Sequence, residues 1–115
     1  MKLEFDEIKD RGTPKERILF NVKEDCDIGE YFVFSTRKTA AGKFSSLVQH
    51  PFWFPDKGVK KGDLVVLYTK KGSSSYKLNA DETSTHFYYR KFDESILEGQ
   101  LVLLVESNTW SIEGF

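Results

Sequence analysis

One segment of the chain constrains its fold most. Residues 63–69, with the sequence DLVVLYT, are apolar on both faces of an extended strand. Successive side chains of a strand point to opposite sides of a sheet, so Val65 and Leu67 share one face and the other carries Leu64, Val66 and Tyr68. A strand with one wet face alternates apolar with polar residues, and this segment does not. It predicts a central strand covered on both sides.

Shorter strands are expected on either side of this segment. Residues 17–22 (RILFNV) and 31–36 (YFVFST) are rich in β-forming residues and predict a hairpin with a long loop, residues 23–30, between its strands. Further strands are expected at residues 44–50, 52–54, 86–90, 100–105 and 109–112. Only one helical turn is expected, within residues 93–99. About 6–8 short strands without an ordinary helix predict an immunoglobulin-like all-β sandwich, with a small β-barrel as the alternative.

The remaining segments are expected to be turns and loops. Residues 37–43, 56–62 and 70–85 are polar or glycine-containing. Residues 1–14 are charged and end in a Gly-Thr-Pro turn, which suggests an N-terminal arm. At 115 residues the chain supports one domain, residues 1–115.

Composition excludes several classes of protein. Hydrophobic residues make up 39% of the chain and charged residues 30%, which is typical of a globular domain and atypical of a disordered or membrane protein. We expect no membrane segment and no signal peptide, and therefore a cytoplasmic location. Cys26 is the single cysteine, so neither an intramolecular disulfide nor a cysteine-based zinc site is expected.

The net charge of −1 conceals an uneven distribution. Residues 1–30, 31–80 and 81–115 carry net charges of −3, +7 and −5. The basic middle segment also contains aromatic residues, and lysines that contact phosphates beside rings that stack on bases are typical of single-strand binding. The candidate binding surface comprises Arg37, Lys38, Lys43, Trp53, Lys57, Lys60, Lys61, Lys70, Lys71, Tyr76 and Lys77. The opposing interpretation is that these lysines keep turns and sheet edges soluble, with the acidic ends packed beside them.

The sequence indicates no catalytic or metal site. His50 and His86 are the only histidines, and neither belongs to a metal-binding motif. The serines at 73–75, together with His86 and Asp81, suggest a catalytic triad, but no nucleophile elbow or oxyanion-hole motif accompanies them. We therefore expect no catalytic residue, no metal and no cofactor.

From residue 52 to residue 105 the order of features resembles the lamin tail domain, an immunoglobulin-like family. The matching segments are FWFP, VKKGDLVVLYTKKG, HFYY and EGQLVLLVES, with looser matches in ERILFNV and GEYFVFS that extend the resemblance to residues 16–112. The Gly-Trp pair and the Asn-containing turn that the family usually has are missing from STRKTAAGKFSSL. The resemblance implies a stand-alone bacterial or phage-borne sandwich that acts as an interaction module and has no shared catalytic residues.

Three functions follow from these observations. The first is a non-enzymatic protein-interaction module that uses its loops or an exposed strand edge. The alternative is a nucleic-acid-binding module that uses residues 37–77. A small hydrolase is the third. An apolar surface patch favours the first, salt-sensitive DNA binding the second, and a pocket that combines His86 with a perturbed carboxylate the third.

Overall fold

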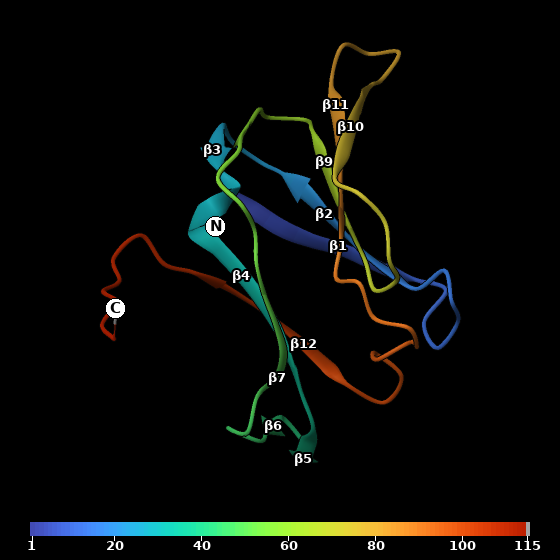
Figure 1. Cartoon of the computed structure of the whole chain (residues 1–115), viewed down its shortest axis with the longest axis vertical. Helices are drawn as coiled ribbons and strands as arrows, with labels where there is room; N and C mark the ends of the chain where they lie inside the picture. Colours follow the sequence, from blue (N-terminus) through green and yellow to red (C-terminus); the bar gives the residue numbers. More distant parts are fainter. Residues whose placement is uncertain (115) are drawn as a thin grey trace.

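The computed structural model describes residues 1–114, and it is an all-β sandwich with two main sheets (Figure 1). The larger sheet has the order β1-β2-β9-β11-β10, formed by Leu3–Lys9, Arg17–Val22, Leu64–Tyr68, Ser84–Tyr89 and Ser75–Leu78. The smaller sheet has the order β12-β4-β7, formed by Leu101–Glu106, Tyr31–Thr36 and Gln49–Trp53. Two short pairs complete the fold, β3 (Cys26–Asp27) with β8 (Gly58–Val59) and β5 (Lys38–Ala40) with β6 (Lys43–Phe44).

The central strand predicted from DLVVLYT is confirmed as β9. It pairs antiparallel with β2 on one side and parallel with β11 on the other. Val65 and Leu67 are buried in the core between the sheets. Val66 is buried on the opposite face, where its register partners are Leu19 and Phe87. Two apolar faces are thus required because β9 has neighbours on both edges and side chains packed over both surfaces.

Phe54 joins the two sheets. It directly follows β7 and is buried. Its ring meets Phe20 of β2 and Tyr88 of β11 edge to face, with centroids 5.8 and 5.4 Å apart. Edge-to-face aromatic pairs contribute roughly 0.5–1.5 kcal/mol each beyond the apolar area that they bury. This cluster therefore holds the smaller sheet against the larger one.

The expected hairpin of residues 17–22 and 31–36 is wrong, although both strands are present. β2 belongs to the larger sheet, whereas β4 pairs with β12 and β7 in the smaller one. The chain changes sheets through β3 and a 3₁₀ turn at Ile28–Glu30, where the Asp27 side chain accepts a hydrogen bond from Gly29 N at 2.8 Å. The buried Ile28 and Gly29 anchor this turn, so it is a corner of the sandwich and not a free loop.

Several segments expected to be irregular are paired strands. Residues 3–9, within the expected arm, form β1 on the edge of the larger sheet, with a register shift between Phe5 and Glu7. Residues 75–78, within the expected loop 70–85, form β10 against β11. Residues 38–44 form the β5–β6 pair. These strands are polar or short, so their pairing partners, and not their own periodicity, make them strands.

Other expected elements are absent from the part of the chain that the structure describes. Residues 93–99 contain no helix, and residues 109–112 form no strand. Within residues 44–50 only Phe44 and residues 49 and 50 are in strands. Neither main sheet closes on itself among residues 1–114, so the alternative of a small β-barrel is not observed.

A buried glutamate connects three segments at the end of the larger sheet. Glu16 is fully buried, and its Oε1 accepts hydrogen bonds from Gly12 N (2.9 Å) and Leu97 N (3.1 Å). Its Oε2 accepts from Thr69 Oγ1 (2.6 Å) and Ile96 N (2.9 Å). Burial by itself raises the pKa of Glu16, but these four hydrogen bonds together lower it below its ordinary value. One ionised side chain therefore fixes the turn before β2, the end of β9 and the connection that leads to β12.

Candidate functional site

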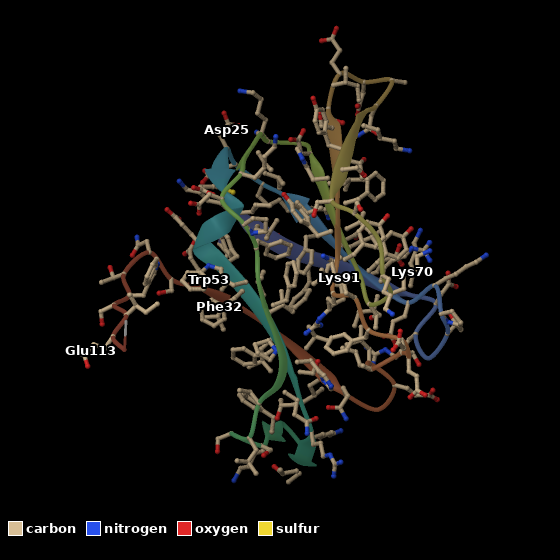
Figure 2. The ribbon with its side chains drawn as sticks, in the orientation of Figure 1. Asp25, Phe32, Trp53, Lys70, Lys91 and Glu113 are labelled. Atoms are coloured by element: carbon tan, nitrogen blue, oxygen red, sulfur yellow. The ribbon has the colours of Figure 1, made fainter. Side chains whose placement is uncertain are left out.

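The basic candidate residues lie in separate parts of the molecule. Lys38 and Lys43 are on the β5–β6 pair, which lies at the opposite end of the molecule from the β10–β11 hairpin that carries Tyr76 and Lys77 (Figure 1). Lys70 lies on the far side of the molecule from Trp53 (Figure 2). Two of the candidate residues from different segments, Lys57 and Tyr76, do lie together. Lys57 Nζ is 5.0 Å from the centroid of the Tyr76 ring.

Several of these lysines have partners within the chain. Lys71 Nζ is 2.8 Å from Asp93 Oδ1 in an exposed ion pair, which raises the pKa of Lys71. Lys70 Nζ lies 5.0 Å from the centroid of the Tyr68 ring. Lys60 and Lys61 stand in the turn before β9, where their backbone amides donate to Asp63 and Asp25. The ammonium groups of Lys70 and Lys71 are thus engaged with neighbouring side chains, whereas Lys60 and Lys61 are held in their turn through the backbone.

An aromatic groove lies on the outer face of the smaller sheet. It has a volume of about 500 Å³ and is lined by Phe32, Pro51, Trp53, Ser107 and Trp110. The two tryptophan rings meet at 83° with centroids 5.0 Å apart. Phe32 lies beside Trp53 with ring centroids 6.2 Å apart, and both face the side along which the C-terminal segment runs (Figure 2). Trp53 and Trp110 are 48% and 61% exposed, so large aromatic surfaces are accessible in this groove.

Strand alternation positions the groove residues. On β7, Pro51 and Trp53 point outward while His50 and Phe52 point toward the core, and Phe32 of β4 is the register partner of Trp53. Trp53 is further held by its indole Nε1, which donates to Gly29 O at 2.6 Å. The C-terminal segment is attached beside them because Ser107 N donates to Glu30 O at 2.7 Å, which places Trp110 against Trp53.

Three glutamates lie on or next to the segments that carry the groove residues. Glu30 immediately precedes β4, Glu106 ends β12, and Glu113 lies on the C-terminal segment (Figure 2). Glu106 Oε2 accepts a hydrogen bond from the buried Tyr31 hydroxyl at 2.5 Å. Burial, followed by this hydrogen bond, raises the pKa of Tyr31 to about 12. The hydroxyl therefore stays protonated and links β4 to β12. Since Tyr31 faces the core and Phe32 faces outward, the bonded Glu106 lies on the core side of the smaller sheet and not in the groove.

A second concave site is centred on His86. This His86 cavity has a volume of about 260 Å³, and it is lined by Pro55, Asp56, Lys57, Ser74, Ser75, Tyr76, His86 and Tyr88. His86 is only 5% exposed, and its Nε2 is 3.0 Å from Asp63 Oδ2. Asp63 also accepts hydrogen bonds from Ser84 N and Lys60 N, at 2.9 and 3.0 Å.

The predicted serine triad is only partly assembled. The carboxylate beside His86 is Asp63, whereas Asp81 accepts hydrogen bonds from the backbone and hydroxyl of Thr83. Ser74 and Ser75 line the cavity, but among the described residues no serine hydroxyl is hydrogen-bonded to His86. A nucleophile requires that contact with its base, so this arrangement differs from a working triad.

The other histidine lies elsewhere. His50 packs edge to face on Phe92, with ring centroids 5.2 Å apart, and its Nδ1 is buried without a partner among the described residues. Burial, and then the nearby Arg90, lowers the pKa of His50. Within residues 1–114 no three side chains of His, Cys, Asp or Glu gather as a set of metal ligands.

Two buried carboxylates make stability depend on pH. Burial raises the pKa of Asp63, but its hydrogen bonds, led by His86, lower the pKa below the ordinary 3.8. Glu16 is likewise lowered from its ordinary 4.5. A depressed pKa stabilises the fold above the ordinary pKa, and this stabilisation is lost as the pH falls toward the folded-state value. Because the pKa of His50 is also lowered from its ordinary 6.5, we expect urea unfolding midpoints to begin to fall below about pH 6.5 and to fall further below about pH 4.5, where the two carboxylates are protonated. A Glu16→Gln variant, less stable at neutral pH, should lose less on acidification; an equal loss would contradict the role of Glu16.

Sequence reasoning missed most of the groove. Trp53 was a candidate, but Phe32, Pro51 and Trp110 were not. One signal in the sequence could have indicated the groove. The segment YFVF places aromatic residues on both faces of its strand, whereas a strand with one buried face needs them on that face only. The partnership of His86 with Asp63 gave no local signal, because Asp63 immediately precedes β9, His86 lies on the neighbouring strand β11, and the two residues are far apart in the sequence.

No known protein family, curated protein or solved structure matches this chain. Among residues 1–114 no helix has the length and apolar character needed to cross a bilayer.

Proposed function

We propose that this protein is a non-enzymatic interaction module that binds an extended, proline-containing segment of another protein in the aromatic groove. The observation that carries the proposal is the pair of exposed tryptophans at right angles, beside Phe32 and Pro51. Grooves lined by aromatic rings accept the preformed left-handed helix of proline-rich segments, which lose little entropy on binding. The role of interaction module that the lamin-tail resemblance implies is part of the same proposal.

The lining of the groove favours a peptide over a sugar. The polar side-chain groups that line the groove are the Ser107 hydroxyl and the two indole N–H groups. The indole N–H of Trp53 is already bonded to Gly29 O. Sugar hydroxyls need several hydrogen-bonding partners, which this groove offers sparingly. Proline rings need apolar contact area, which it offers in abundance.

The charge around the groove specifies the partner further. Glu30 is bonded through its carbonyl to Ser107 of the groove, and Glu113 follows Trp110 on the C-terminal segment, so a partner with lysine or arginine beside its prolines is complementary. The nucleic-acid alternative has less support, because the candidate lysines lie apart (Figure 1) and none of them lines the groove.

The chain's two tryptophans, Trp53 and Trp110, both lie in the groove, so their emission reports directly on binding. We expect a synthetic proline-rich peptide with flanking lysines to shift this emission saturably. The same peptide with flanking glutamates should bind more weakly, and added salt should reduce the difference.

The matched variants remove one exposed hydrophobic side chain each. Trp110→Ala should weaken peptide binding by at least about tenfold, since tryptophans at interface centres contribute about 2 kcal/mol or more. Leu78→Ala removes an even more exposed hydrophobic side chain on β10, outside the groove, and should leave binding unchanged. Equal affinity of the wild type and Trp110→Ala, measured by calorimetry, would refute the groove as the binding site.

A further inference from the structure

The His86 cavity is a second concave site that the proposed peptide binding does not use. Its walls come from the segment before β8, from the start of β10 and from β11. None of its lining residues lines the aromatic groove. Its chemistry also differs, because hydroxyls, an ammonium group and an imidazole stand beside the aromatic rings.

The imidazole of His86 is held in one orientation. Asp63 is a hydrogen-bond acceptor, and its two other hydrogen bonds come from backbone amides, so it stays ionised and His86 Nε2 carries a proton. The lowered pKa of Asp63 agrees with this state. The ring's second nitrogen, Nδ1, is left for a ligand, and it donates a hydrogen bond when the imidazole is protonated.

A lysine ammonium lies at the opening of the cavity. Lys57 Nζ lies over the Tyr76 ring, which in turn lies beside His86 with ring centroids 6.1 Å apart. Asp56 also lines the cavity and is exposed, and its Oδ1 lies close to Gly29. Lys57 supplies the one ammonium group among the residues that line this site.

We propose that the His86 cavity binds the phosphate group of a small phosphorylated ligand. A phosphate presents several acceptor oxygens to donors placed around it. Here the donors are the Lys57 ammonium and the hydroxyls of Ser74 and Ser75, beside the imidazole of His86. The buried Asp63 orients His86 without touching the ligand.

Inorganic phosphate is the probe that tests this site in the full-length chain. The ring signals of His86 and the amides of residues 74–76 are followed by NMR while phosphate replaces chloride at constant ionic strength. We expect saturable shifts at these positions with phosphate and none with chloride. Lys57→Ala should weaken binding by at least about tenfold, because it removes a charge-assisted hydrogen bond.

Lys70→Ala is the matched control. Lys70 also places its ammonium 5.0 Å from a tyrosine centroid, on Tyr68, but it does not line the His86 cavity. This variant should bind phosphate like the wild type. Non-saturable shifts, equal shifts with chloride, or equal weakening by the two lysine variants would each overturn the proposal. Because peptide binding is read from the tryptophans, the failure of either site leaves the other unaffected.

Discussion

Glu16→Ala is expected to lower the free energy of unfolding by about 3–5 kcal/mol, a large part of the stability of a domain of this size. The substitution removes the acceptor of four hydrogen bonds, from Gly12 N, Thr69 Oγ1, Ile96 N and Leu97 N. A buried donor left without a partner costs about 1–3 kcal/mol. It also removes a negative charge that stabilises the charged form of Arg90, whose buried guanidinium has no hydrogen-bond partner among the described residues.

Urea unfolding followed by circular dichroism measures this loss, and Glu16→Gln is the matched variant. Glutamine keeps the size of the side chain and one acceptor oxygen, but it turns an NH₂ group toward donors and carries no charge. Its loss of stability should therefore fall between those of wild type and alanine. If the alanine variant lost less than about 1 kcal/mol, the hydrogen-bonded glutamate would not be the link between the turn, β9 and the connection to β12.

Leu67→Asp is expected to leave no folded protein at neutral pH. Leu67 is 1% exposed on the central strand β9, between β2 and β11, and it faces the core that joins the two sheets. A carboxylate there has no cation or donor assigned to it, and burying an unpaired charge costs more than the roughly 5–15 kcal/mol that stabilises a domain. The aspartate would be accommodated only by unfolding or by protonation.

The comparison is the double variant Lys60→Glu, Lys61→Glu in the turn before β9. Both side chains are exposed, and the hydrogen bonds of this turn come from their backbone amides, so the turn should survive the change. We expect a dispersed NMR spectrum for the double variant and a collapsed one for Leu67→Asp. The reverse order would mean that β9 is not the central strand.

The sequence predicted the candidate sites less well than it predicted the fold. Trp53, Lys57 and Tyr76 were recognised as surface residues of interest, but they were placed in one surface together with lysines that the structure separates. Trp53 lies in the aromatic groove, and Lys57 and Tyr76 line the His86 cavity. Residues close together in the basic segment were predicted to share one surface. That prediction is wrong, because consecutive strands of a sandwich run in opposite directions and carry these residues to separate parts of the molecule.

The carboxylate that is hydrogen-bonded to His86 could not be predicted from the sequence either. Asp81 is nearer to His86 in the sequence, but it is used by its own turn, where Thr83 donates to it. Asp63 reaches His86 because β9 and β11 are parallel neighbours with Leu64 opposite Thr85. A parallel pair needs a crossover connection, and its register cannot be read from the periodicity of either strand.

The amino-acid sequence by itself determined the class of the fold and the position of its centre. Period-two alternation in RILFNV and the two apolar faces of LVVLY are local properties, and β2 and β9 appear where these patterns predict them. The tertiary structure alone decided which strands are neighbours, made strands of the polar residues 75–78, and assembled Phe32, Trp53 and Trp110 into one groove. The physical reason is that alternation reports which faces of a strand are buried, whereas the choice of a neighbour depends on contacts between residues far apart in the chain.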